Sequence, residues 1–339
     1  MAGLNLTFMG DDTWTGLFPN SFRKSFAYPS FDVWDIHTVD DGVTAHLSEE
    51  MAAGDWQVLI AHCLGVDHIG HRFGPEHPQM KSKLRQMDSL IENVVGNMDS
   101  ETLLLVIGDH GMTQTGDHGG DSSDEINSAL FAYSRNGQIS STKRVDQAPT
   151  DSLMNQVDLV PTLALLMGVP IPFSNLGAVN LDLIAPEKDP GITEKHFELI
   201  KLTRLGDALN LNVGQIWRYL SSYEGSSFPI AEFQELESLF QEIDQIYQRL
   251  NSRCSENMDY CTEEVLLEEM IRKSQSFLSK SKEMCRSIWA QFDLLSIAVG
   301  LAIFAVALMV NWMSISDVID LNSIQLMACC SLTAFILQV

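Results

Sequence analysis

The sequence has few basic residues. Its 339 residues include 21 Lys and Arg against 45 Asp and Glu, which gives a formal net charge of −24. A protein that neutralises nucleic-acid phosphates needs a basic face, so this charge excludes nucleic acid as a partner. Most of the acidic residues are expected to form a solvated surface.

Cysteine is also scarce, with six residues and no Cys-x-x-Cys site. Cys254 and Cys261 flank a short polar loop, and they form either a local disulfide, if the region lies in an oxidising lumen, or a pair of free thiols. Cys63 and the adjacent Cys329 and Cys330 are expected to be ordinary buried residues.

The N-terminus lacks the charged segment and apolar stretch of a signal peptide. Residues 1–3 run directly into a strand-like segment at residues 4–9, so we expect the chain to start inside a fold. The one glycosylation sequon, at Asn5, falls in this core strand and is expected to be unused.

A first polar cluster follows a predicted apolar strand at residues 56–66. Asp67 and His71 are four residues apart, so a helical turn after the strand would place them on the same face, as two ligands of one metal require. An Asp-x-x-x-His pair on its own is more often a surface pair.

A second cluster follows the apolar segment 102–107, which predicts a buried parallel strand. Open α/β sheets place their sites at the carboxyl ends of strands. With a helix predicted at 81–97 between the two strands, the sequence predicts one βαβ unit that presents both clusters at one sheet edge. The polar residues of this second cluster are Asp109, His110 and His118.

The ligand types favour zinc. Asp67, His71 and His118 would supply one oxygen and two nitrogens, which is the three-ligand arrangement of a catalytic zinc with an open position.

The rest of the N-terminal half alternates strands with helices, which predicts an α/β fold with a doubly wound sheet. Further strands are expected at 30–36 and 128–134, with a turn at Asp40, Asp41 and Gly42 before a helix that ends at Met51. The polar run 135–151 is predicted to be a surface loop. A helix is expected at 158–167, with Pro161 in its first turn.

The pattern divides the chain into three regions: a partial catalytic domain at 1–190, a helical region at 191–290 and a membrane region at 291–339. Helices are predicted at 208–223, 231–251 and 263–289 from apolar residues at helical spacing. Residues 294–313 carry no charge and are long enough to cross a bilayer. A second apolar segment begins near Ile324 and stops at Val339, so we expect both ends of the chain to be cut.

Several motifs resemble the GPI ethanolamine phosphate transferases of the alkaline phosphatase superfamily. The superfamily resemblance rests on V-D-H-I-G-H, G-D-H-G-M and G-D-H-G-G, and the narrower one on residues 8–14, 62–67, 74–78 and 158–177. The similarity is dense over residues 4–182. It implies an alkaline phosphatase-like catalytic domain.

This resemblance implies a reaction and a second zinc. Asp109 and His110 would belong to the second ion, together with a threonine nucleophile and an Asp that we expect upstream of residue 1. Thr7, Thr13 and Thr15 do not match the context of that nucleophile. The implied reaction transfers phosphoethanolamine from phosphatidylethanolamine to a mannose of the GPI precursor, which we expect to be the third.

Asp11, Asp12 and His68 are candidate substrate-binding residues. The Asp pair follows a predicted strand end, where it could touch substrate or metal, and His68 could orient substrate. The structural alternative for the Asp pair is a helix cap, and for His68, as for His62 and His77, it is packing or support of a ligand.

The resemblance also implies a partner, a small multi-pass membrane subunit of the PIG-F type, and a multi-pass position in the endoplasmic reticulum membrane with a luminal catalytic domain. The positive-inside rule favours the opposite orientation, because Lys and Arg precede the predicted span and none follows it. We prefer the luminal orientation. Alternatives are a paralogous transferase, another metal-dependent phosphodiesterase of the superfamily, or a non-catalytic membrane interaction protein.

Overall fold

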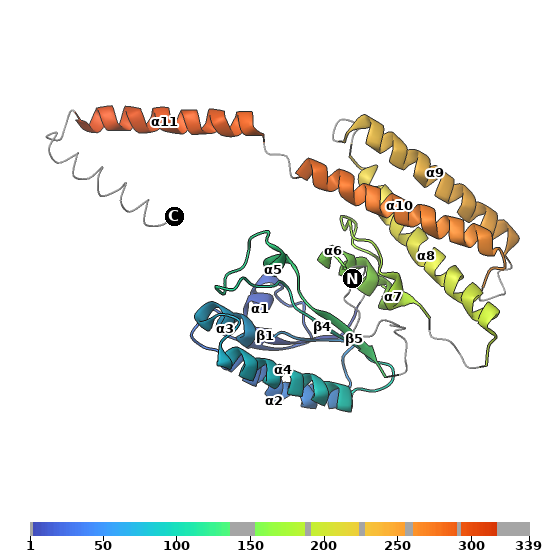
Figure 1. Cartoon of the computed structure of the whole chain (residues 1–339), viewed down its shortest axis with the longest axis horizontal. Helices are drawn as coiled ribbons and strands as arrows, with labels where there is room; N and C mark the ends of the chain where they lie inside the picture. The colour runs from blue at the N-terminus through green and yellow to red at the C-terminus, as the bar shows by residue number, and fades with distance from the viewer. Residues whose placement is uncertain are drawn as a thin grey trace.

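The computed structural model describes residues 3–135, 153–186, 191–223, 228–254, 260–289 and 293–316. These residues form a mixed α/β region, a bundle of long helices and an isolated apolar helix, α11, at the C-terminal side (Figure 1).

The α/β region is built on three parallel strands in the order β2-β1-β3: β1 is Leu6–Asp11, β2 is Lys24–Tyr28 and β3 is Val58–Ala61. Phe8 and Met9 on β1 are fully buried. Helices α2 (Thr38–Ala53) and α4 (Pro78–Asn97) pack together on one face of this sheet, where their apolar side chains surround Met9 (Figure 1).

The strand expected at 30–36 is wrong. These residues form a loop, and the strand lies earlier, at β2. Carboxylates bend the loop: Asp32 Oδ1 accepts from the Trp34 amide, and Asp35 Oδ1 accepts from the amides of His37 and Thr38. Such side-chain bonds to nearby backbone amides stabilise turns in competition with strands.

The turn expected at residues 40–42 is also wrong, because α2 already begins at Thr38. Asp40 and Asp41 lie in the first turn of this helix, where the positive end of the helix dipole favours carboxylates. The same acidic pattern therefore suits a helix N-terminus as well as a turn.

The second polar cluster does not follow a parallel strand of the main sheet, as predicted. β4 (Leu103–Ile107) pairs antiparallel with β5 (Leu130–Ser134) in a separate two-stranded sheet. Its side chains are half-buried or exposed, not buried. An aliphatic run does not reveal whether its partner strand is parallel or antiparallel. The single βαβ unit and the doubly wound sheet are therefore corrected: the described residues form an α/β fold with two separate sheets.

Four short helices complete this region: α1 (Thr13–Leu17), α3 (Gly65–Phe73), α5 (Ser123–Ile126) and α7 (Leu181–Ile184). A longer one, α6, spans Gln156–Leu166 and begins at a capping box of Asn155 and Asp158. This cap starts the helix before the expected residue 158, so Pro161 lies in its second turn and not in its first.

Three long helices form the bundle: α8 (Glu194–Leu220), α9 (Ile230–Arg253) and α10 (Glu264–Trp289). They enclose one apolar core. The α8 helix starts well before the predicted residue 208, because the Thr193 hydroxyl caps its N-terminus by accepting from the His196 amide. Cys254 and Cys261 form a disulfide that closes the connection between α9 and α10, which settles the alternative left open by the sequence.

The apolar helix α11 (Leu294–Ser316) contains a 20-residue stretch, Leu294–Met313, with a mean hydropathy of 2.4 and none of it buried. This is the length that a membrane span needs. Most of the predicted 135–151 loop, the second apolar segment from Ile324, and Cys329 and Cys330 lie outside the described residues.

Candidate metal centre

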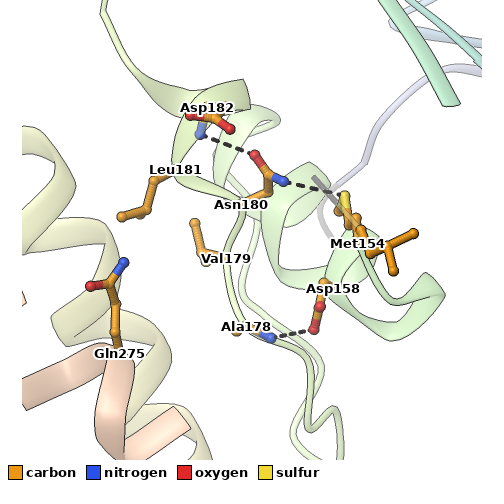
Figure 2. A pocket seen from close by; sticks show the side chains of 9 residues that line it. Met154, Asp158, Ala178, Val179, Asn180, Leu181, Asp182 and Gln275 are labelled. Atoms are coloured by element: carbon orange, nitrogen blue, oxygen red, sulfur yellow. Dashed lines mark hydrogen bonds between the residues drawn. The ribbon is translucent and has the colours of Figure 1, made fainter. Parts of the chain in front are cut away.

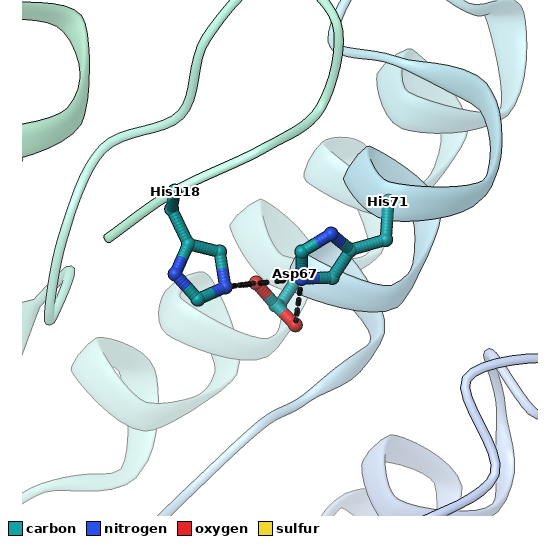
Figure 3. A group of neighbouring side chains, drawn as sticks. All are labelled: Asp67, His71 and His118. Carbon is teal, nitrogen blue, oxygen red and sulfur yellow. Dashed lines mark hydrogen bonds and ion pairs between the residues drawn. The ribbon is translucent and has the colours of Figure 1, made fainter. Parts of the chain in front are cut away.

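Asp67, His71 and His118 converge on one point, as the sequence predicts. Their ligand atoms all lie within 4.8 Å of one another. His71 Nε2 lies 3.0 Å from His118 Nε2, and the Asp67 carboxylate lies 3.5 Å from the first nitrogen and 3.4 Å from the second. Figure 3 shows the three side chains pointing toward one another from α3 and from the loop that carries His118.

Helix α3 supplies two of these side chains because it begins directly after β3, so Asp67 and His71 are one turn apart on the same face. Its N-terminus is held by Asp40, whose Oδ1 accepts from the amides of Leu64 and Gly65 at 2.9 and 3.0 Å. Lys83 Nζ lies 2.8 Å from the other oxygen of Asp40, and this ion pair is almost completely buried.

The loop 108–122 brings in the third side chain, and glycine makes its approach possible. Gly116 has φ +88°, and a Cβ at that position would lie 2.1 Å from the carbonyl oxygen of Gly70 on α3. A Cβ on Gly70 would in turn collide with Met112. The loop that carries His118 and the helix that carries His71 thus meet backbone to backbone.

Glu125 fixes the far side of the same loop. Its carboxylate accepts from the Ser122 hydroxyl at 2.5 Å and from the Gly120 amide at 2.8 Å. The bond from Ser122, followed by the bond from Gly120, lowers the pKa of Glu125. The ionised carboxylate therefore holds the segment that follows His118.

Asp109 and His110 lie next to this group. The rings of His110 and His118 stack with centroids 3.9 Å apart. The Asp109 side chain is 77% exposed, with Oδ2 3.6 Å from His110 Nε2. Gln156 at the start of α6 donates a hydrogen bond to the Asp109 carbonyl. The two polar clusters thus meet although their strands belong to different sheets.

The remaining candidates occupy three different settings. Asp11, at the end of β1, is buried, with Oδ2 2.6 Å from His62 Nδ1. Asp12 is exposed and accepts from the Ser30 hydroxyl. His68 is buried on α3, with Nδ1 2.8 Å from the Asp35 carbonyl oxygen. His77 caps α4 by accepting from the Gln79 amide.

The group of Asp67, His71 and His118 fits a metal ion in two respects: its ligand types, and one buried carboxylate oxygen that lacks a hydrogen bond. One carboxylate and two imidazoles are the ligand types of catalytic zinc sites. Asp67 Oδ1 is buried and accepts no hydrogen bond in the part of the chain that is described, which is costly unless a cation lies nearby.

Sequence reasoning missed the residues that support the site, namely Asp40, Lys83, Glu125 and Gln156. The i,i+3 spacing of Ser122 and Glu125 at a helix start is a signal that could have revealed the role of Glu125. The Asp40–Lys83 pair spans 43 residues, and no local pattern reveals it.

Comparison with known proteins agrees with this geometry. Residues 9–150 match the family described as type I phosphodiesterase / nucleotide pyrophosphatase. The chain is 42% identical over 306 residues to the GPI ethanolamine phosphate transferase 3 catalytic subunit of Homo sapiens. The aligned residues cover 90% of this chain and 27% of that protein. No solved structure matches the chain.

Two fungal relatives show the same pattern. GPI ethanolamine phosphate transferase 3 of Saccharomyces cerevisiae is 34% identical over 316 residues, which is 91% of this chain and 28% of that protein. GPI ethanolamine phosphate transferase 2 of Yarrowia lipolytica is 40% identical over 198 residues, or 55% of this chain and 23% of that protein. The chain thus spans about a quarter of the length of these relatives. Residues 9–150 thus resemble the type I phosphodiesterase and nucleotide pyrophosphatase family, and the chain as a whole is similar to the GPI ethanolamine phosphate transferases.

Proposed function

We propose that the protein transfers phosphoethanolamine from phosphatidylethanolamine to a mannose, the third, of the GPI anchor precursor. The observation that carries this proposal is the convergence of Asp67, His71 and His118 in a chain that resembles GPI ethanolamine phosphate transferase 3 over nine tenths of its length.

Asp67, His71 and His118 would hold one zinc ion, and Asp109 and His110 would contribute to a second. When bound, such a pair of ions neutralises charge on a transferring phosphoryl group and activates a hydroxyl nucleophile. The chain keeps the ligand atoms of the first group in place through the Asp40 bonds to the start of α3. Through Gln156, it holds the backbone at Asp109 in place.

The substrate contacts follow from charge and exposure. We assign Asp12 to the ethanolamine ammonium, because its carboxylate is exposed at the end of β1 and is oriented by Ser30. Asp11 would act from behind by holding His62, which lies 2.6 Å away. His68 would position α3 by its contact with the Asp35 carbonyl and would not touch substrate directly.

The wider context of the proposal has three parts. Residues 1–190 would be catalytic, 191–290 a luminal helical region, and 291–339 part of a multi-pass membrane region in the endoplasmic reticulum that includes α11. The two lipid substrates would meet the enzyme there. A PIG-F-type subunit would be the partner, and the human relative's designation as a catalytic subunit supports such an assembly.

A second candidate is the paralogous activity, since a GPI ethanolamine phosphate transferase 2 is 40% identical over 198 residues. The transferase 3 relatives from human and Saccharomyces cerevisiae cover about nine tenths of the chain, against 55% for this paralogue. Analysis of the GPI glycans that accumulate in deficient cells, by mass spectrometry, separates the two by the mannose that lacks phosphoethanolamine.

Substitution of one ligand tests the activity. Asp67→Asn or His118→Ala in the full-length protein should abolish rescue of GPI-anchored surface proteins in cells that lack the enzyme, while the protein still accumulates, because both side chains are partly exposed and leave no core cavity. Asp121→Asn, an exposed change in the same loop, is the matched control and should rescue. Full rescue by either ligand variant would refute the assignment.

A sequon engineered into an exposed turn tests the orientation. Residues 99 and 101 are exposed after α4, so Asp99→Asn with Glu101→Thr creates a sequon that a luminal domain would carry glycosylated. An unmodified sequon in a protein that is cut there by protease in intact microsomes would place the domain in the cytosol.

A further inference from the structure

An exposed apolar surface lies beside the metal centre and takes no part in the chemistry described so far. Within 18 residues of chain, five large apolar side chains face solvent, and Phe31 and Trp34 are 93% and 66% exposed. We call this surface the apolar rim; its residues are Leu17, Phe18, Phe31, Val33 and Trp34. Groups of exposed apolar residues mark binding surfaces more often than isolated ones do.

The rim is tied to the helix that carries two of the candidate ligands. The guanidinium of Arg72, the neighbour of His71, lies 4.5 Å from the centre of the Trp34 ring and donates to the Trp34 carbonyl at 3.3 Å. His68, on the same helix, contacts the Asp35 carbonyl. The loop from Phe31 to Trp34 is therefore held against α3.

The other part of the rim is tied to the same loop. Leu17 and Phe18 lie at the end of α1, which follows β1. The Ser30 hydroxyl bonds to the Asp12 carboxylate at 2.8 Å and lies 3.1 Å from the Thr13 hydroxyl at the start of α1. The two apolar segments thus follow the carboxyl ends of β1 and β2. Because the strands are parallel, these ends lie at the same edge of the sheet as the end of β3, which leads into α3.

The chain itself indicates what covers the rim. Helix α11 carries a 20-residue apolar stretch with none of its surface buried, and a bilayer is the solvent that such a helix requires. A chain with a net charge of −24 is repelled by anionic lipid, and Asp32 lies between Phe31 and Val33 of the rim. Trp is enriched at the interface of a bilayer, and Trp, Phe and Leu form the buried faces of helices that lie in that interface.

We propose that the apolar rim inserts into the surface of a zwitterionic bilayer and so places the metal centre at the level of the lipid head groups. The proposal rests on membrane attachment through α11 but not on the transfer reaction. Because the contact is apolar, it persists in high salt, which would weaken a charge-driven contact.

The experiment uses the full chain in vesicles of phosphatidylcholine and phosphatidylethanolamine, with p-benzoylphenylalanine in place of Phe31. Illumination should attach lipid to this position, with the same yield at low and at high salt. The matched control carries the photoreactive residue in place of Val265, an apolar side chain that is 77% exposed on α10. It should acquire several-fold less lipid in the same vesicles.

Two outcomes overturn the proposal: equal lipid labelling at the two positions, or cross-linking of position 31 to protein, including a second copy of this chain. Repeating the experiment with Asp67→Asn separates the two hypotheses, because lipid labelling should be unchanged when transfer is lost. A functional readout in the full-length protein is Phe31→Ser with Trp34→Ser, which should raise the KM for donor lipid in vesicles and leave the KM for a short-chain, water-soluble donor unchanged.

Discussion

The α/β region and the helical bundle are held together by different interactions. Inside the α/β region, several of the fully buried side chains are ionisable, and the Asp40–Lys83 pair is 0% and 2% exposed. The bundle instead encloses aliphatic and aromatic side chains such as Leu236, Ile243 and Phe277. Polar bonds have defined directions whereas apolar contacts do not. The α/β region therefore gains precise placement of its ligands, and the bundle gains stability.

The largest expected effect comes from breaking the buried ion pair. Lys83→Met leaves the buried Asp40 carboxylate without its cation, which should destabilise the α/β region by about 3–5 kcal/mol and weaken metal binding at the candidate site, because Asp40 also holds the start of α3. Chemical denaturation and metal titration of the full chain measure the two effects. Lys81→Met, at an exposed position on the same helix, is the control. A loss of less than about 1 kcal/mol would mean that the pair is not buried in solution.

A truncation in the bundle should have the complementary effect. Leu236→Ala removes a side chain that is 1% exposed and should destabilise the bundle by roughly 2–5 kcal/mol through lost burial and a cavity. Metal affinity should stay the same, because no bundle side chain contacts the ligands in the described residues. Leu211→Ala, on the exposed face of α8, should change little. A loss of metal affinity in the Leu236 variant would show that the two regions act as one unit.

The contact between the two regions is a smaller target. Lys282 on α10 lies 2.6 Å from Asp158 on α6, and Arg286 donates to Asn155 at 2.9 Å. Asp158 also lines a 370 Å³ pocket, together with Asn180 and Gln275, among others (Figure 2). Lys282→Met should cost roughly 1.5–3 kcal/mol, as for a lost hydrogen bond to a charged group.

Because Asp158 caps the helix that begins with Gln156, this variant should also increase proteolysis near Asp109. Limited proteolysis with mass spectrometry checks this. Lys280→Met, on the same helix in an exposed pair with Glu235, should behave like the unchanged protein. Equal cleavage in both variants would indicate that the regions are not coupled through α6.

The smallest effect concerns Cys63 and Cys285, the free thiols of the described residues, one in each region. Burial, and secondarily the charge of Asp40, raises the pKa of Cys63 to about 12, and burial raises the pKa of Cys285 to about 11. Both thiols should therefore react slowly with iodoacetamide at pH 8 until denaturant is added. A thiol in the unfolded chain ionises at a lower pH than the buried thiol does. The free energy of unfolding should therefore fall as the pH rises above 9.0, the ordinary pKa of a cysteine thiol. Fast alkylation of Cys63 alone would locate local opening in the α/β region.

The local parts of this arrangement could be predicted from the sequence, whereas the contacts between distant segments could not. The turn of helix that joins Asp67 and His71 is a local pattern, and so are the heptad-like faces of α9 and α10. The pairing of β4 with β5 and the ion pair between α2 and α4 are not, because they depend on which distant segment supplies the partner. His118 lies beside Asp67 and His71, as expected, even though the strand before it was placed in the wrong sheet, because the loop after that strand carries His118 to α3.

The meeting of Gly70 and Gly116 affects how related sequences should be compared. With a Cβ on Gly116 only 2.1 Å from the Gly70 carbonyl oxygen, a relative could retain all three ligand residues and still be unable to bring them together. An alanine at position 116 would force apart the helix and loop that carry His71 and His118. Whether a homologue can assemble this group of three side chains therefore also depends on the residue at position 116, and a comparison of the three residues alone would overlook it.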